Sequence, residues 1–336
     1  MADTPILRVR DLSVTFSVGK GKTFTAVDKV SFDLNKGETL ALVGESGSGK
    51  STVALSIMGL FDPGSARVDG RIRLRRKNGD HAELTHLPER EMRRVRGNDV
   101  AMIFQEPMAS LDPIYRAGDQ IAEAIAAQRR GPSAERMAEA VRLLRILGVP
   151  SPERTAQRFP HELSGGTRQR VMIAMAISCQ PKLLVADEPT TALDVTIQAQ
   201  IIDELRSLQR QTGMAILFIT HDLGLVAEIA DRVLVMYAGR VVESGPVREV
   251  FAAPRMPYTR GLLRSRPRIG GRRTGAARIQ PIPGSAPNPA FLPSGCAFHP
   301  RCDLVDPRTC AVEEPALAVP GAGRTVRCWR WPEVAP

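Results

Sequence analysis

The order of apolar and polar residues along the chain predicts a fold that contains both strands and helices. Segments 6–16 and 25–34 are rich in β-branched and aromatic residues, which predicts two strands joined by the turn at 19–22. Residues 64–104 alternate short strands with Gly and Asn turns. Apolar residues recur at helical spacing over 117–149, so we expect a mainly helical insert there.

Two later segments, 183–186 and 215–220, are continuous apolar runs. Runs of this kind are typical of parallel strands that are covered on both faces. The first run ends in Asp187 and Glu188, and the second ends in His221. Because ligands of α/β proteins bind at the carboxyl ends of such strands, we expect these three side chains at one edge of a sheet.

A glycine-rich loop lies between the apolar run at 41–43 and a helical pattern at 53–58. Residues 44–51 read Gly-Glu-Ser-Gly-Ser-Gly-Lys-Ser and match the phosphate-loop pattern G-x-x-x-x-G-K-[ST]. The glycines let backbone N–H groups close around phosphate oxygens at a helix N-terminus, where negative charge is favoured. Lys50 is then expected to reach the β- and γ-phosphates, and the Ser51 hydroxyl to bind Mg²⁺.

A second helix N-terminus is predicted at Leu163-Ser-Gly-Gly-Thr-Arg-Gln-Arg170, ahead of the apolar segment 171–177. A serine and two glycines open this helix, so its exposed N–H groups predict another site for an anion.

Two aromatic residues of the N-terminal strands are candidates to stack on an adenine base. These are Phe16 and Phe24, and the alternative for both is that they fill the core, as most strand phenylalanines do.

The charge of the 336-residue chain is unevenly distributed. It carries 46 Lys and Arg against 36 Asp and Glu, and residues 251–336 contribute +8 of the net +10, mostly from Arg255 to Arg278. Aromatic residues make up 4% of the chain, too few for the stacking surface of a nucleic-acid-binding protein. We interpret the basic tract as a solvated linker, or as one that faces anionic lipid or a partner.

The sequence has no apolar run near the roughly 18 residues of a membrane span, and its first residues lack a secretory pattern. We therefore expect a cytoplasmic protein whose membrane role depends on partners. Beyond residue 251 the chain is rich in proline, which predicts a linker and a small loop-rich module.

Four of the five cysteines, Cys296, Cys302, Cys310 and Cys328, lie in the last 41 residues. A cytoplasmic location disfavours disulfides, so a metal or iron–sulfur site is the leading interpretation. The spacing C-x5-C-x7-C-x17-C lacks the C-x2-C pairs of structural zinc, while four thiolates on irregular backbone suit a [4Fe–4S] cluster. Zinc is the second alternative and free thiols are the third. Cys179 is expected to be a buried apolar residue.

Together these elements resemble the nucleotide-binding subunit of an ATP-binding cassette (ABC) transporter over roughly residues 5–255. The motifs occur in the order of that family: the Walker A loop at 44–51, the Q-loop at Gln105, an LSGGQ-type signature at 163–169, the Walker B strand at 183–188, the D-loop at 192–194 and the switch histidine at His221. Thr167 stands where glutamine is commonest in the signature, and Thr191 stands where serine opens the D-loop. The glycines and Asp194 remain, so neither change indicates an inactive site.

In that family two subunits sandwich two ATP molecules, and each signature helix completes the partner's site. The resemblance implies that Glu188 polarises the attacking water, that His221 contacts the γ-phosphate, and that Gln105 senses it and faces the permease. The implied Mg²⁺ ligands are Ser51, Gln105 and Asp187. The implied ATP-binding residues are Phe16, Gly44, Glu45, Ser46, Gly47, Ser48, Gly49, Lys50, Ser51, Thr52 and Asp187, with Ser164, Gly165 and Gly166 acting in the partner's site and Gln169 and Asp194 as further candidates.

Segments 103–113 and 257–263, together with the long C-terminal extension, are similar to the dipeptide/oligopeptide importer group of ATPases. Some members carry a [4Fe–4S] cluster in a Cys-x-Phe-x-Pro-Arg-Cys segment, to which 296–302 is similar. The resemblance implies an ATP-hydrolysing subunit that energises peptide import at the cytoplasmic face of the membrane. The implied partners are a second ATPase, expected to be a paralogue, two permease subunits and an extracytoplasmic substrate-binding protein.

The fold implied by the resemblance is an α/β P-loop NTPase core over 1–255, with an antiparallel β subdomain and a helical subdomain at about 106–165. A small irregular module with the four cysteines would follow at 256–336. Three alternatives remain: import of a nickel chelate or glutathione by the same class of transporter, a cysteine-containing tail that acts as a redox or metal sensor, and a soluble ABC-type ATPase acting on nucleic acid or the ribosome. The last is disfavoured because such proteins usually have two cassettes or an inserted coiled coil.

Overall fold

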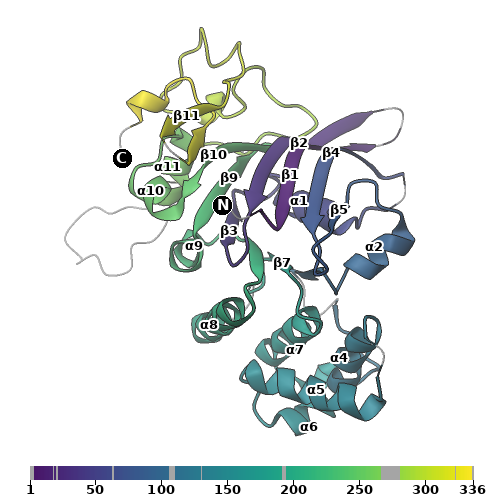
Figure 1. The fold of residues 1–336 in the computed structure, drawn as a ribbon. Coiled ribbons are helices and arrows are strands. Elements are labelled where there is room, and N and C mark those ends of the chain that lie inside the picture. The colour runs from purple at the N-terminus through teal and green to yellow at the C-terminus, as the bar shows by residue number, and fades with distance from the viewer. Residues whose placement is uncertain are drawn as a thin grey trace, which may run out of the picture.

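The computed structural model describes residues 4–17, 19, 22–62, 64–105, 110–129, 131–190, 194–265, 281–321 and 323–334. In these ranges the chain forms an eight-stranded sheet in the order β11-β12-β10-β9-β3-β8-β7-β6 and a four-stranded sheet in the order β2-β1-β4-β5 (Figure 1). The strands are β1 (Leu7–Ser17), β2 (Thr23–Leu34), β3 (Thr39–Val43), β4 (Ala66–Arg75), β5 (His81–Glu83), β6 (Val100–Ile103), β7 (Leu183–Asp187), β8 (Ala215–Ile219), β9 (Arg232–Tyr237), β10 (Arg240–Pro246), β11 (Ala318–Gly321) and β12 (Arg324–Val326).

Helices cover the larger sheet and form a separate group at one end of the molecule. They are α1 (Lys50–Met58), α2 (Glu89–Val95), α4 (Ala117–Ala126), α5 (Ser133–Ile146), α6 (Pro152–Ala156), α7 (Gly165–Ile177), α8 (Val195–Thr212), α9 (Leu223–Ile229), α10 (Val247–Ala252) and α11 (Pro257–Arg264), with short 3-10 turns η1 (Pro160–Glu162), η2 (His299–Arg301) and η3 (Trp331–Glu333). None of the helices in the described part of the chain is both long enough and apolar enough to cross a membrane.

The centre of the larger sheet is parallel. β3 pairs with β8 on one side and β9 on the other, and β7 pairs with β8 and β6. Every residue of β3, β7 and β8 is buried, because helices or the second sheet cover both faces. The two apolar runs were therefore correctly predicted to be strands, and their carboxyl ends bring the loops after β3, β7 and β8 to one edge.

The smaller sheet is antiparallel and packs one face on the larger sheet and α1. Its buried positions alternate along β1, with Leu7 and Val9 in a core cluster that also contains Ile57 of α1 and Leu217 of β8. The two predicted N-terminal strands are confirmed. Part of the predicted turn at 19–22 lies outside the described residues.

Helices α4 to α7 form the lower group in Figure 1 and share a second core cluster with the larger sheet. The helical pattern at 117–149 corresponds to α4 and α5, which are separate because Pro132 precedes α5 and cannot continue α4. Helix α8 begins at Asp194, whose side chain accepts a hydrogen bond from the Ile197 N–H. The sequence patterns did not predict α2 or α8.

The chain beyond residue 255 is largely irregular, as its proline content predicts. Its described residues still contribute one helix and two strands that pack on the rest of the fold. Helix α11 opens with Pro257 at a position where a missing N–H costs little. Strands β11 and β12 extend the larger sheet beyond β10. Residues 266–280, which hold most of the predicted basic tract, lie outside the described residues, and the predicted domain boundary at 255 stays a prediction.

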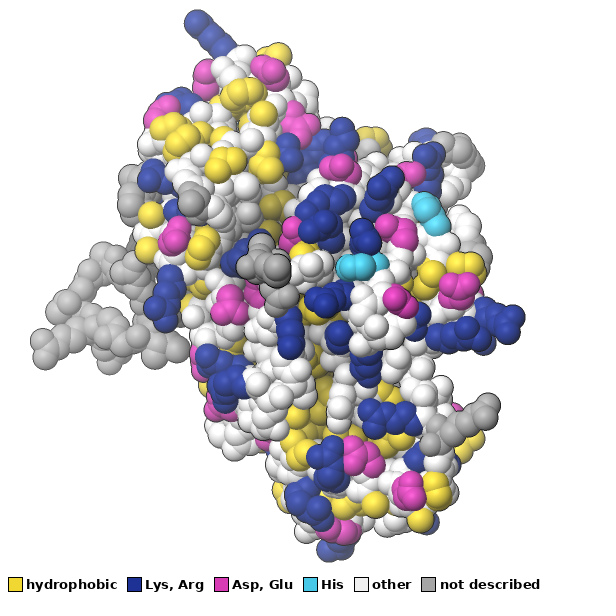
Figure 2. All heavy atoms as spheres, viewed as in Figure 1, with side chains coloured by type: hydrophobic (Ala, Val, Ile, Leu, Met, Phe, Trp, Pro, Cys, Tyr) yellow, Lys and Arg dark blue, Asp and Glu magenta, His cyan; other side chains and the backbone are white. Residues whose placement is uncertain are grey.

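Lys and Arg side chains gather over the exposed face of the antiparallel sheet (Figure 2). The strand register places Arg8 opposite Arg73 and Arg10 opposite Arg71. Asp33 pairs with Arg8 at 3.4 Å and with Arg10 at 2.7 Å. Like charges directly opposite on a sheet are destabilising, so this face holds local repulsion although the first 250 residues are close to neutral.

Replacing Arg71 by glutamate should therefore stabilise the fold. Arg71→Glu turns the repulsive pair with Arg10 into an attractive one, with an expected gain of about 0.5 kcal/mol in the free energy of unfolding. Urea denaturation at low salt measures the change, and high salt should reduce it because exposed charges are screened. Arg71→Gln is the control and should give a smaller gain. A loss of stability at low salt in Arg71→Glu would contradict the interpretation.

Candidate functional site

The phosphate loop turns from β3 into α1 through conformations that glycine adopts readily. Gly44 and Gly49 have φ values of 152° and 100°. A Cβ at Gly44 would overlap the carbonyl oxygen of Met236 on β9, and a Cβ at Gly49 would lie 2.6 Å from the carbonyl oxygen of Ala26 on β2. The loop packs directly onto two strands, and these contacts fix its path.

Lys50 opens α1 and turns its ammonium group back onto the loop. Its Nζ donates to the carbonyl oxygens of Gly44 at 2.8 Å and Glu45 at 2.9 Å, and lies 3.4 Å from the Oγ of Ser48. Burial lowers the pKa of Lys50, and the carboxylates of Glu188 and Asp187 oppose this effect. The ammonium is therefore held inside the loop, where phosphate oxygens would be its natural partners.

Asp187 ends β7 beside Ser51. Its side chain forms a hydrogen bond with Ser51, burial raises its pKa, and its Oδ1 is buried without a hydrogen-bond partner in the described part of the protein. A buried acceptor with no partner is costly, and a cation would satisfy it. Carboxylate and hydroxyl oxygens are ligands that Mg²⁺ prefers, so Asp187 and Ser51 fit the ion expected with ATP.

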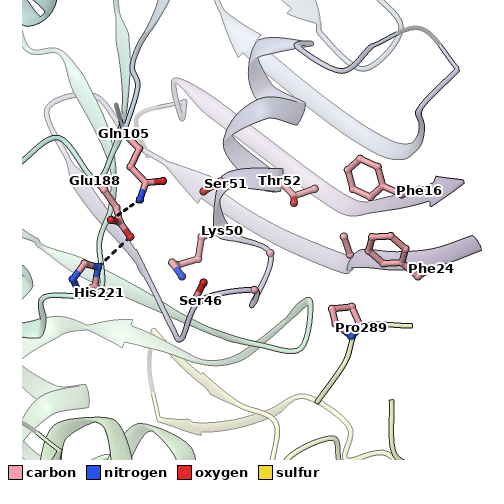
Figure 3. Close-up of a pocket in the computed structure, with 13 residues that line it drawn as sticks. Phe16, Phe24, Ser46, Lys50, Ser51, Thr52, Gln105, Glu188, His221 and Pro289 are labelled. Atoms are coloured by element: carbon pink, nitrogen blue, oxygen red, sulfur yellow. Dashed lines mark hydrogen bonds and ion pairs between the residues drawn. The ribbon is translucent and has the colours of Figure 1, made fainter. Parts of the chain in front are cut away.

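Glu188 is the point where three predicted residues meet (Figure 3). Its Oε2 accepts a hydrogen bond from Gln105 Nε2 at 3.1 Å, and its Oε1 lies 3.1 Å from His221 Nδ1. The backbone of Glu188 has φ 47°, a left-handed conformation that is uncommon for a residue with a side chain and is concentrated at functional sites. The expectation that Glu188 and His221 share one sheet edge is correct.

An open pocket of about 370 Å³ lies over the phosphate loop. It is lined by Phe16, Phe24, Ala26, Ser46, Gly47, Gly49, Lys50, Ser51, Thr52, Gln105, Glu188, His221 and Pro289. The rings of Phe16 and Phe24 stack on one another with centroids 5.5 Å apart, at the end of the pocket away from Glu188 (Figure 3). Both remain partly exposed at the pocket, which leaves ring surface for stacking on a base, although Phe16 also packs against the core cluster of the smaller sheet.

Several predicted ATP-binding residues do not line this pocket. Glu45 turns away from it to pair with Arg301, and Ser48 is buried under the loop at 4% exposure. Gln169 is 2% exposed and donates to the Pro189 carbonyl oxygen, so its side chain supports the loop after β7. Sequence reasoning missed Arg301 and Pro289 because both are distant in sequence from the phosphate loop.

The signature residues border a separate hollow. Ser164 caps α7 by accepting from the Thr167 N–H at 3.3 Å, and its Oγ lies 2.9 Å from the Thr167 hydroxyl. Thr167 thus keeps the helix N-terminus ordered where glutamine is commoner. The hollow is lined by Gly148, Pro150, Ser164, Gly165, Gly166, Thr167, Arg170, Asp194, Ile197 and Gln200. Residues 191–193 of the predicted D-loop lie outside the described residues.

The four C-terminal cysteines lie in the module that follows α11, and three of them, Cys296, Cys302 and Cys328, pack against one core cluster. The N–H of Cys296 donates to the carbonyl oxygen of Cys310 at 2.8 Å. Burial raises the pKa of Cys302 to about 11 and of Cys328 to about 12, and the neighbouring cysteines add to both shifts. Among the described residues, no group of three or more His, Cys, Asp or Glu side chains is arranged to hold a metal ion, so the structure gives no support to the predicted metal or iron–sulfur site. Cys179 is buried, as expected.

Comparisons with known proteins place this fold and site in a family. Residues 27–191 match the family described as ABC transporter, and residues 242–310 match the oligopeptide/dipeptide transporter C-terminal region. A Brucella melitensis protein assigned to peptide import is 52% identical over 100% of both chains. The dipeptide transport ATP-binding protein DppD of Escherichia coli is 47% identical over 96% of both chains.

A solved structure agrees with these relatives. A dimeric ATP-binding cassette in a post-hydrolysis state, bound to ADP and Pi, superimposes with a TM-score of 0.63 at 27% identity, covering 72% of this chain and 99% of that chain. The site and the fold define a P-loop ATPase of the cassette type. The chain belongs to the ABC transporter family, as one of its ATP-hydrolysing subunits.

A partly buried carboxyl group that packs against the signature helix makes stability depend on pH. Arg170 of α7 lies 3.2 Å from Glu204 of α8, and burial raises the pKa of Glu204 to about 7. Between the unfolded pKa and about 7, the folded state holds more protons than the unfolded state. The contribution of Glu204 to stability therefore falls as pH rises through this window.

Glu204→Gln removes this titration. The stability of the variant relative to the wild type should rise by about 2 kcal/mol between pH 5 and pH 8, because only the wild type must ionise a buried carboxyl. Urea denaturation across this pH range measures the difference. Asp203→Asn, on the adjacent residue of α8, is the control: it removes only a smaller contribution to the raised pKa of Glu204 and should keep most of the pH dependence. A difference that stays flat or falls with pH would show that Glu204 is ionised throughout.

Proposed function

We propose that this chain binds MgATP over the phosphate loop and uses its hydrolysis to energise peptide import through partner permeases at the cytoplasmic face of the membrane. The observation that carries the proposal is the convergence of Lys50, Glu188 and His221 on one pocket. Asp187 lies behind this pocket and is hydrogen-bonded to its lining residue Ser51. The match of residues 242–310 to the oligopeptide/dipeptide transporter C-terminal region supports peptides as the cargo. The names of the relatives AppD of Bacillus subtilis and DppD point the same way.

Each side chain at the site has a role that its position supports. The loop N–H groups and Lys50 bind the phosphates, while Phe16 and Phe24 receive the adenine base. Ser51 and Asp187, with Gln105, would hold Mg²⁺, which neutralises charge on the phosphate oxygens when bound. Phosphoryl transfer needs positioning and charge neutralisation more than covalent chemistry, and this set of residues supplies both.

Glu188 accepts the proton of the attacking water in this proposal. Gln105 and His221 orient its two carboxylate oxygens, so that one oxygen can be presented to a water molecule beside the γ-phosphate. His221 is 66% exposed, which leaves it free to turn from Glu188 to a phosphate oxygen. Ser164, Gly165 and Gly166 act in the site of a second ATPase subunit, for which a paralogue is the proposed candidate.

Glu188→Gln tests this function in the chain purified with its membrane partners and reconstituted with the substrate-binding protein. The variant should bind ATP within about threefold of the wild type but lose ATP turnover at least about 100-fold, since the general base is gone. ATP-dependent uptake of labelled dipeptide into vesicles should stop with it. Glu228→Gln, at an exposed position on α9, is the control and should keep both activities.

Two results would contradict the proposal. Normal ATP turnover by Glu188→Gln would remove Glu188 from its role. Uptake of nickel chelate or glutathione in place of any peptide by the wild-type complex would reassign the cargo, and a complex without membrane partners would favour a soluble ATPase.

We also propose that Cys296, Cys302, Cys310 and Cys328 hold a [4Fe–4S] cluster that staples the C-terminal module. A single ion needs ligands that converge on one point, whereas each thiolate of a cube binds a different iron. The sequence also lacks the C-x2-C pairs of structural zinc, which favours the cluster over zinc. Burial raises the pKa of Cys302 and Cys328, so a metal would have to displace the protons of these two thiols. We propose a structural role and not electron transfer, because no other feature of the chain suggests electron transfer.

The cluster proposal predicts about four iron and four acid-labile sulfide per chain in anaerobically purified protein. Cys310→Ser should lower both, because it removes one of the four ligands. Cys179→Ser is the matched control and should leave both unchanged, since Cys179 lies in a different core. Iron and sulfide near zero in the wild type would exclude the cluster. One equivalent of zinc per chain would then indicate a zinc site.

A further inference from the structure

The phosphate loop is contacted by a residue 256 positions further along the chain. Arg301 donates to both carboxylate oxygens of Glu45, at 2.7 Å and 3.0 Å. Glu45 is the second residue of the loop, and Arg301 lies in the segment between Cys296 and Cys302. The Arg301 side chain is 5% exposed and the Glu45 side chain 30%, so the guanidinium is shielded from water and the bidentate contact has one defined geometry.

Arg301 is itself held in place by its surroundings. Its Nε donates to the Pro283 carbonyl oxygen at 2.8 Å, and its guanidinium carbon lies 5.9 Å from the ring centroids of both Tyr237 and Phe298. The rings of Tyr237, Tyr258 and Phe298 pack on one another with centroids 4.6 to 5.4 Å apart. The arginine therefore reaches the loop from a rigid aromatic base.

The backbone of Glu45 extends the connection to Lys50. Its N–H donates to the hydroxyl of Tyr258 on α11 at 2.8 Å, and its carbonyl oxygen accepts from Lys50 Nζ at 2.9 Å. Two residues from beyond position 255 thus hold Glu45, and Glu45 holds Lys50. Any displacement of Glu45 moves the oxygen on which the ammonium rests.

The same C-terminal region reaches the pocket at a second point. Pro289 is one of its lining residues, on the side of Phe24 (Figure 3). The segment that carries Pro289 follows Pro283, whose carbonyl oxygen is bonded to Arg301. The same segment, 283–289, therefore contributes a residue to the pocket wall and holds the arginine that contacts the loop.

We propose that Arg301 is a positioning residue for ATP binding. Through Glu45 it holds the phosphate loop in the conformation in which Lys50 meets the phosphates, so the ATP site includes the C-terminal module of its own chain. A displacement of about 1 Å in a site of this kind costs on the order of 100-fold in activity. The inference rests on the proposed ATP site, whose failure would be recognised separately, as a lack of ATP binding by the unmodified chain.

The competing interpretation is that Arg301 only anchors the module, and the chain offers a matched anchor for comparison. Arg260 of α11 donates to both carboxylate oxygens of Asp303, at 2.8 Å and 2.6 Å. This pair joins α11 to the cysteine-containing segment through one guanidinium nitrogen, so it anchors that segment without touching the phosphate loop. Neither Arg260 nor Asp303 lines the nucleotide pocket or bonds to the phosphate loop in the described structure.

The test is steady-state ATP hydrolysis by the full chain in its transporter complex, with the melting temperature measured on each variant. Arg301→Met should raise the KM for MgATP about tenfold, and Arg301→Lys should raise it less because the charge remains. Arg260→Met should lower the melting temperature, because it removes the bond to Asp303, but keep the KM within twofold. Equal changes of KM in Arg301→Met and Arg260→Met, or none in either, would overturn the proposal.

A second measurement keeps the proposal testable if Arg301→Met folds poorly. Glu45→Gln preserves the size of the side chain and should raise the KM for MgATP by a similar factor. The double variant Glu45→Gln/Arg301→Lys should be no worse than the more affected single variant, because both changes act on one pair. Effects on KM that multiply in the double variant would show that the two residues act independently and would overturn the proposal.

Discussion

The close approach of the phosphate loop to strand β9 is the constraint on which the rest of the structure depends. At Gly44 the loop passes the carbonyl of Met236 with no space for a side chain, and at Gly49 it meets the backbone of β2 in the same way. These contacts join the loop to both sheets at once. Because β9 also pairs with β3, the strand that leads into the loop, the position of the loop is set by the register of the sheet.

The same edge concentrates charge that water cannot reach freely. Burial lowers the pKa of Lys50 and raises that of Asp187, so burial disfavours the charged form of each group. The charge of the other group partly offsets this effect. The carboxylate of Glu188 is held by Gln105 and His221. Its backbone has a left-handed conformation that glutamate adopts rarely. These contacts within the chain organise the site, and an organised site loses little free energy to rearrangement during the reaction.

Much of this could be predicted from the sequence because the signals are local. The loop at 44–51 and the apolar runs that end at Asp187 and His221 are each encoded within a few residues, and topology brings their ends together. Helix α8 was missed although Ile197, Ile201, Leu205 and Leu208 recur at helical spacing in this mostly polar segment, so the local signal for it was present. The pair of Glu45 and Arg301 has no local signal, since neither residue type reveals a partner 256 positions away.

Two long-range relationships therefore complete the nucleotide site in different ways. The lining of the pocket, over the described residues, includes Pro289 from the C-terminal module but no residue of α7 or α8, which open onto a hollow of their own. An anion-binding helix N-terminus that cannot serve the pocket of its own chain is suited to a second subunit, as proposed above. The C-terminal module acts from behind the loop within one chain. ATP binding would then report both the assembly of two subunits and the folding of the cysteine-containing module, because each supplies contacts that the phosphate loop cannot make by itself.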